Sequence, residues 1–180
     1  SNPLTGFTGG DVALKSAGPL AFGPDGILFV GDSVGGQVVA IDTQDRKPAA
    51  AAKVDVEGID AKIAAQVGVP ADQIMINDVK VNPISKDVYL SASRGRGPDA
   101  MPLIVRVRAG QITVLPLDNV MHSSVRLTDS PASNAGPRGD PRMLTITDMA
   151  YVNGDLMVAG LSNEEWSSAL RSIPFPFQKT

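Results

Sequence analysis

The sequence predicts an all-β protein, and two observations support this fold class. The 180-residue chain is rich in turn formers, with 18 glycines and 14 prolines, and only 4% of its residues are aromatic. Short apolar runs lie between these turn formers, which is typical of β-strands joined by many tight loops. The second observation is a pattern of two apolar runs joined by a turn, which occurs three times along the chain.

The repeated pattern spans residues 18–33, 77–93 and 147–162. The turns include Pro-Asp-Gly at 24–26 and Asn-Gly-Asp at 153–155, which favour tight turns because Asn and Gly tolerate positive φ and Pro presets φ. Further apolar runs follow the first two repeats, at residues 37–42, 103–108 and 111–115. We therefore expect antiparallel meanders over residues 18–43, 76–115 and 146–160, and repetition of such a meander indicates a β-propeller.

The predicted fold is a β-propeller fragment of about three four-stranded blades with two short helical inserts. One partial propeller would fill residues 1–180, with blade-like units at about 12–55, 74–120 and 143–180 and inserts at 56–73 and 128–142. In the first insert Ile59, Ile63 and Val67 recur every four residues, which predicts one face of a helix that ends at Gly68. The second insert is a Pro/Gly/Ser-rich loop without periodicity.

The second helix is expected after the third repeat. Ser162-Asn-Glu-Glu165 is a capping-box pattern, in which a Ser hydroxyl and a Glu carboxylate accept hydrogen bonds from the first N–H groups of a helix. It predicts a helix from about residue 163 to 171, ended by Pro174 and Pro176, with residues 173–177 extended.

Three units and a fragment cannot close a ring of at least ~4 blades, and unpaired strand edges invite pairing with another chain. We expect a complementary polypeptide that completes the propeller, namely the C-terminal part of the same precursor separated near Thr180. A homodimer of two half-rings is the second choice. The start at Ser1-Asn2-Pro3 likewise suggests a processed or truncated product.

Composition excludes several classes of function. The chain has no cysteine, so thiol catalysis, disulfides and Cys-based zinc sites are excluded. Its formal net charge is −3 and its Lys and Arg residues are scattered, so we expect no nucleic-acid partner. No apolar run approaches the ~20 residues that span a bilayer, and we expect a soluble periplasmic or secreted protein.

The repeats resemble known propellers. Residues 17–32 resemble a blade of the NHL and SMP-30/gluconolactonase-like families, and Asn77-Asp78-Val-Lys-Val-Asn-Pro83 resembles the Asn-Asp stretch of the second family. That resemblance implies a divalent cation, often calcium, at the channel mouth and hydrolysis of lactones. Ala17 stands where the family has a metal-binding Glu, and Thr147 stands where it has an Asn, so only Asn77 matches a ligand position.

Candidate metal ligands are Asn77, Asp78 and Asp148. The two aspartates occupy the same repeat position and open the first strand of their units, so their carboxylates would converge on the central channel. Oxygen ligands without sulfur suit Ca²⁺ or Mg²⁺. The alternative is that each aspartate accepts hydrogen bonds from neighbouring backbone N–H groups.

Candidate ligand-binding residues are Asp32, Arg94, Arg96 and Glu164. Arg94, Arg96 and Glu164 follow matching strand ends of two repeats and are expected on one face. The arginines would bind a carboxylate ligand there or pair with glutamate across blades.

No catalytic residue is predicted. Residues 31–35 fit G-x-S-x-G, but a nucleophile elbow needs a helix after the serine, whereas a second strand follows here. His122, the only histidine, is interpreted as a polar loop residue rather than a metal ligand or a member of a catalytic triad. The leading hypothesis is a propeller-type binding platform for a small molecule or protein. The alternative is a metal-dependent hydrolase of the lactonase type with its site at the channel.

Overall fold

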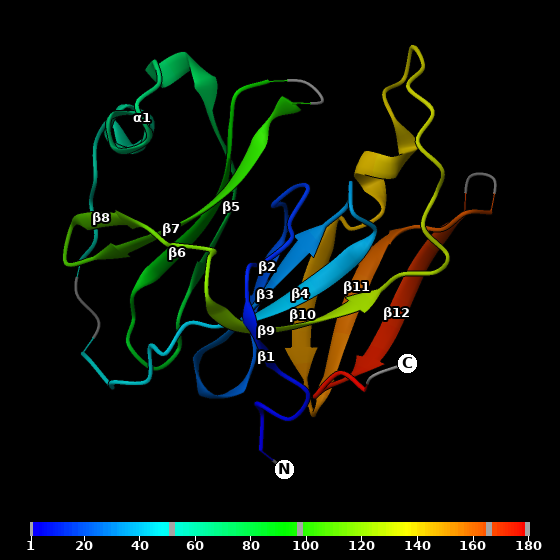
Figure 1. Ribbon diagram of the computed structural model, residues 1–180, viewed down its shortest axis with the longest axis horizontal. Coiled ribbons are helices and arrows are strands. Elements are labelled where there is room, and N and C mark those ends of the chain that lie inside the picture. The colour runs from blue at the N-terminus through cyan, green and yellow to red at the C-terminus, as the bar shows by residue number, and fades with distance from the viewer. Residues whose placement is uncertain (1, 51–52, 97–98, 165–166, 179–180) are drawn as a thin grey trace.

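The computed structural model describes residues 2–50, 53–96, 99–164 and 167–178. This part of the chain is mainly β, with three antiparallel sheets of five, four and three strands and one short α-helix (Figure 1). In chain order the strands are β1 Thr8–Gly10, β2 Leu20–Phe22, β3 Ile27–Asp32, β4 Gln37–Asp42, β5 Ile74–Val81, β6 Val88–Arg94, β7 Met101–Arg108, β8 Gln111–Val114, β9 Val120–Arg126, β10 Asp148–Val152, β11 Asp155–Leu161 and β12 Ser168–Pro174.

The three predicted meanders are confirmed. The first sheet contains β2, β3 and β4, the second sheet runs β5-β6-β7-β8, and the third sheet runs β10-β11-β12. Their turns follow from the local sequence. At the β10–β11 hairpin, Asn153 has φ 51° and Gly154 has φ 96°, a backbone form that Asn and Gly adopt at little cost.

The first sheet has two further strands that were not expected. Strand β9 pairs antiparallel with β4, with Gln37 opposite Arg126, and β1 pairs with the other edge of β9. The sheet order is therefore β1-β9-β4-β3-β2. In the sequence, the whole second sheet lies between β4 and β9, which are neighbours in the first sheet. The expectation of uniform four-stranded units is wrong for the first and third sheets.

The first sheet forms the middle of the stack. Along β3, Ile27 and Phe29 pack against the third sheet, whereas Leu28 and Val30 pack towards the second sheet. All six residues of β3 are buried because both faces of the strand are covered. Figure 1 shows the second and third sheets on opposite sides of the first. The third repeat thus packs on the first repeat rather than on the second.

The insert helix is confirmed. Helix α1 spans Ile59–Val67 and ends at Gly68, whose φ of 70° is a left-handed cap. Ile63 is fully buried, and Ile59 and Val67 pack against the same apolar cluster of the second sheet. The helix therefore covers the face of the second sheet that the first sheet does not.

The second predicted helix is wrong. Residues Ser168–Pro174 form β12, which pairs with β11 from end to end. Ser162 Oγ does accept a hydrogen bond from the Glu164 N–H, at 3.4 Å, but within the loop that joins two strands. Glu165 of the predicted capping box lies outside the described residues.

Within the described residues the three sheets do not close a ring. Strand β2, the first strand of its repeat, lies beside both β5 and β10, which are the first strands of the other two repeats. No helix in this part of the chain is long and apolar enough to cross a membrane.

Candidate functional site

Asn77 and Asp78 join the second sheet to the first. A register irregularity between Ile76 and Asp78 interrupts the β5–β6 pairing at Asn77, and such bulges redirect side chains. Asn77 Nδ2 donates to the Ala17 carbonyl at 2.7 Å. Asp78 Oδ2 accepts from the Leu20 N–H at 2.8 Å, and its Oδ1 accepts from the Val79 N–H at 2.8 Å. Both side chains thus contact neighbouring backbone groups.

The hydrogen bond of Asp148 is local to β10 and involves neither Asn77 nor Asp78. It is exposed at the start of β10, and its Oδ1 accepts a hydrogen bond from the Met149 N–H at 2.8 Å. Within the described ranges, no three His, Asp or Glu side chains gather in an arrangement that could hold a metal ion. Asp78 and Asp148 thus each accept a hydrogen bond from the backbone N–H of the following residue, and Asn77 donates to a backbone carbonyl.

Asp32 organises the β3–β4 hairpin. Its side chain is fully buried and accepts hydrogen bonds from five groups: the Lys15, Ser16 and Gly35 N–H groups, the Ser16 hydroxyl and the Gln37 amide. A Cβ at Gly35 would lie 2.1 Å from Asp32 Oδ2, so the turn requires glycine there. The G-x-S-x-G segment is a hairpin turn, as interpreted from the sequence.

The arginines and Glu164 are not joined. Arg96 Nη2 donates to the Asp72 carbonyl at 2.8 Å, which ties it to the segment before β5. Arg94 is exposed at the end of β6, and Glu164 is exposed in the β11–β12 loop. Among the described residues no ion pair links either arginine with Glu164.

His122 lies in strand β9, not in a loop, which corrects the interpretation from sequence. Its Nδ1 is 2.8 Å from the Val120 carbonyl oxygen.

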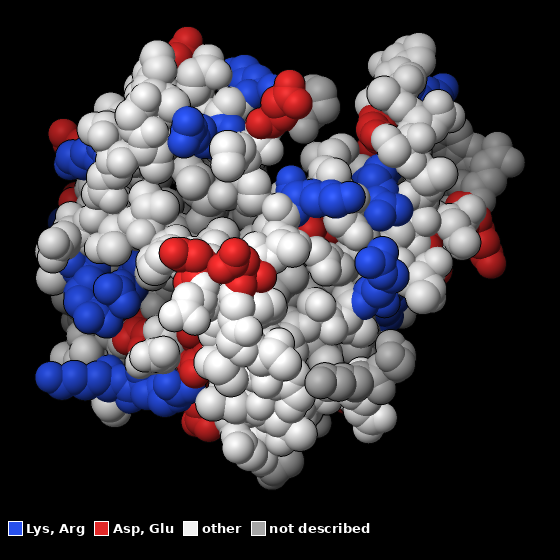
Figure 2. All heavy atoms as spheres, in the orientation of Figure 1, with Lys and Arg blue, Asp and Glu red and all other residues white. Residues whose placement is uncertain are grey.

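Charged groups elsewhere are interspersed: Figure 2 shows basic and acidic side chains mixed over the viewed face without a continuous basic surface.

The third sheet leaves one face uncovered, and we call this surface the open face. Leu170 is 69% exposed and Val152 is 49% exposed, while Leu156 and Val158 on the opposite face are fully buried against the first sheet. Because side chains alternate along a strand, the register places the following residues on the open face. They are Asp148, Ala150, Val152, Asp155, Met157, Ala159, Leu161, Ser168, Leu170, Ser172 and Pro174.

The charge on the open face is negative. Asp148 stands at one end of the β10–β11 pair and Asp155 at the other, and none of the strand residues on this face is Lys or Arg. Arg171, the one cation of β12, points to the covered side, where its Nε donates to Asp129 at 2.9 Å and its Nη1 donates to the Thr145 carbonyl. Among its described strand residues, the open face therefore combines an apolar centre with two carboxylates and no Lys or Arg.

Sequence reasoning missed the open face because it assigned residues 163–171 to a helix. A period of two in hydropathy predicts a strand with one buried face. Exposure alternates along β12, but hydropathy does not, because Arg171 lies on the covered side and Leu170 on the exposed side, so the sequence carried little signal for this strand.

Comparison with known proteins adds no family assignment: no family model, curated protein or solved structure matches this chain.

Proposed function

We propose that this chain is a propeller-type binding platform whose three sheets act as blades and whose open face binds a protein partner. The observation that carries the proposal is the difference in covering between the sheets. The first sheet is packed on both faces, and the second sheet lies between the first sheet and α1. The third sheet is packed on one face, and Leu170 on its other face is 69% exposed.

The expected occupant is another β-sheet. Both faces of the first sheet pack on sheets, and aligned sheets interdigitate their apolar side chains about 10 Å apart. The open face lies at the end of this stack of sheets. Its apolar side chains, among them Val152, Met157 and Leu170, can pack on a further sheet as those of the first sheet do on its two neighbours. Each apolar side chain removed from water would contribute about 25 cal/mol per Å² of buried surface.

Charge distinguishes between the two partners predicted from the sequence. A second copy of the chain would present Asp148 and Asp155 to an identical surface that contains no cation. A like charge facing a like charge opposes association, whereas an opposite charge supports it. We therefore favour a different polypeptide, one that completes the propeller and carries Lys or Arg at the rim of an apolar sheet.

The metal-dependent hydrolase has less support. Asn77, which matches a ligand position of the family, and Asp78, a candidate ligand from its repeat position, hydrogen-bond to the backbone of Ala17, Leu20 and Val79. Their contacts hold the first two sheets together, so the binding platform accounts for them without a bound ion.

A photo-crosslinking residue placed at Leu170 tests the proposal in cells that make the full protein. The same residue placed at Val79, which is 52% exposed on β5, is the matched control. We expect position 170 to crosslink one β-rich polypeptide. V152D should reduce the yield of that crosslink at least fivefold, and it should leave any crosslinking from position 79 unchanged.

Crosslinks from position 170 only to a second copy of this chain would refute the choice of partner. Equal capture of the same polypeptide from positions 79 and 170, or no crosslink at position 170, would refute the open face as a binding surface.

A further inference from the structure

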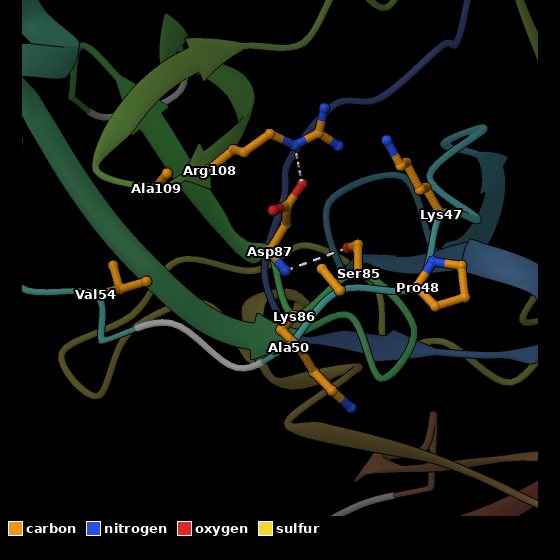
Figure 3. A pocket seen from close by; sticks show the side chains of 10 residues that line it. Lys47, Pro48, Ala50, Val54, Ser85, Lys86, Asp87, Arg108 and Ala109 are labelled. Carbon is orange, nitrogen blue, oxygen red and sulfur yellow. Dashed lines mark hydrogen bonds and ion pairs between the residues drawn. The ribbon is translucent and has the colours of Figure 1, made fainter.

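A cavity of about 320 Å³ lies away from the open face, beside the second sheet. Its walls come from the segment 47–50, the turn at 85–87 and the β7–β8 hairpin (Figure 3). The volume falls at the lower end of the range for small-molecule sites, about 300–1,000 Å³. The chemistry of its polar wall depends on a buried carboxylate behind it.

Asp45 is that carboxylate, and it is 4% exposed. It accepts hydrogen bonds from Ser85 Oγ at 2.6 Å, from Tyr89 Oη at 3.0 Å and from Asn82 Nδ2 at 3.0 Å. Burial opposes ionisation of Asp45, but these hydrogen bonds and the charge of Arg108 outweigh it and lower the pKa. Asp45 is therefore a fixed anion with its acceptor sites occupied.

Arg108 is held at the cavity by two carboxylates. Its Nε donates to Asp87 Oδ2 at 2.7 Å, and its Nη2 donates to Asp45 Oδ1 at 3.0 Å. The hydrogen bond that Arg108 donates to Asp87 raises the pKa of Arg108, and the charges of Asp87 and Asp45 raise it further against the opposing effect of desolvation. The side chain is nevertheless 53% exposed, and its Nη1 has no partner among the described residues.

Lys47 provides the second cation. Figure 3 shows Arg108 and Lys47 extending to the same side of the cavity, whereas Lys86 points the opposite way. Lys86 Nζ donates to the Pro83 carbonyl, and Lys47 makes no ion pair with a described residue. The cavity thus offers N–H donors from a fixed guanidinium and from an unpaired ammonium group.

The remaining wall is apolar, formed by Pro48, Ala50, Val54 and Ala109. We propose that this cavity binds a small aliphatic monocarboxylate, with its carboxylate on Arg108 and Lys47 and its hydrocarbon body against the apolar wall. Nε and Nη2 of Arg108 already donate to Asp87 and Asp45. The ligand carboxylate would therefore accept charge-assisted hydrogen bonds from the Arg108 Nη1 and from the Lys47 ammonium group. The charges of Arg108 and Lys47 are balanced by those of Asp87 and Asp45, so a second negative charge on the ligand, as on phosphate, gains no further net attraction.

The test is a two-dimensional NMR titration of the full chain with butyrate at neutral pH and low salt. We expect saturable shifts confined to residues 47–50, 85–87 and 108–109, with a Kd on the order of 1–10 mM for so small a ligand. Butanol and butylammonium, which have the same number of carbon atoms but no negative charge, should bind at least tenfold more weakly. Raised ionic strength should weaken butyrate binding.

The variant K47Q should weaken butyrate binding about five- to tenfold, since one exposed cation is removed and the Asp45 network is left intact. K62Q removes the same charge from an exposed position on α1 and should leave the Kd unchanged within twofold. Spectra of both variants report directly whether the fold is retained.

Three results would overturn the proposal. They are the absence of saturable shifts near Arg108, equal binding of butyrate and butylammonium, and tighter binding of inorganic phosphate than of butyrate. Equal effects of K47Q and K62Q would show that net charge, rather than this cavity, governs the interaction.

Discussion

Replacing Ile63 with Asp tests the packing of α1 on the second sheet. Ile63 is fully buried in a cluster with Leu90, Val105 and Val107. Loss of a buried Ile side chain costs about 1.5–3 kcal/mol, and the carboxylate that replaces it has no cation in the cluster. The helix can escape the penalty by detaching, which limits the loss to the energy of its docking. We therefore expect unfolding to become easier by about 2–4 kcal/mol.

Urea denaturation followed by circular dichroism measures this change, and thermal denaturation should show a melting temperature lower by about 5–15 °C. A61D is the matched control, because it places the same charge on the exposed side of the same helix. A loss below about 0.5 kcal/mol for I63D, or an equal loss for A61D, would refute the packing of this face on the sheet.

Two further predictions concern the core of the stack. Burial, the Asp45 charge and the hydrogen bond to Asp45 raise the pKa of Tyr89 to about 12, so the unfolded chain loses this proton first as pH rises. The contribution of Tyr89 to stability should be constant below pH ~10 and fall by about 2–3 kcal/mol between pH ~10 and ~12, and Y89F should flatten that fall in denaturation curves. A Cβ at Gly160 would lie 1.9 Å from the Thr145 carbonyl oxygen, so G160A should destabilise the chain by about 2 kcal/mol or more. G136A, with no atom within 4 Å of its Cβ, should change stability by less than about 0.5 kcal/mol, and equal effects of the two variants would contradict the close approach.

Local rules predicted the hairpins and the helix because their determinants lie within a few residues. Asn153 and Gly154 specify their turn through the backbone conformations that they tolerate, and Gly68 ends α1 for the same reason. The β12 segment shows where local rules fail. Its capping box favours a helix, but pairing with β11 gives every second residue, including Ile173, a place against the first sheet. Tertiary pairing outweighs the small difference in intrinsic propensity.

The candidate site was harder to predict than the hairpins, because a carboxylate's role depends on donors that are remote in the sequence. Asp78 accepts from Leu20, which is 58 residues away, and Asp45 accepts from Tyr89, which is 44 residues away. The repeat pattern predicts Asp78 at a strand start, whereas the residue lies inside β5, which begins at Ile74, and the pattern carries no information about which group faces it. Asp45 and Arg108 belong to no motif, so their pairing emerges only from the fold.

The return of the chain through β9 has a consequence for the order of assembly during synthesis. The second sheet is contiguous, because β5 to β8 occupy residues 74–114 and each pairs with its neighbour in the chain. The first sheet begins earlier, yet the outer edge of β4 stays unpaired until residues 120–126 have left the ribosome. Since domains fold progressively as the chain emerges, the second sheet can be complete while the first sheet still lacks β9, and with it the pairing of β1. The first sheet, which forms the middle of the stack, is thus completed after the second sheet that packs on it.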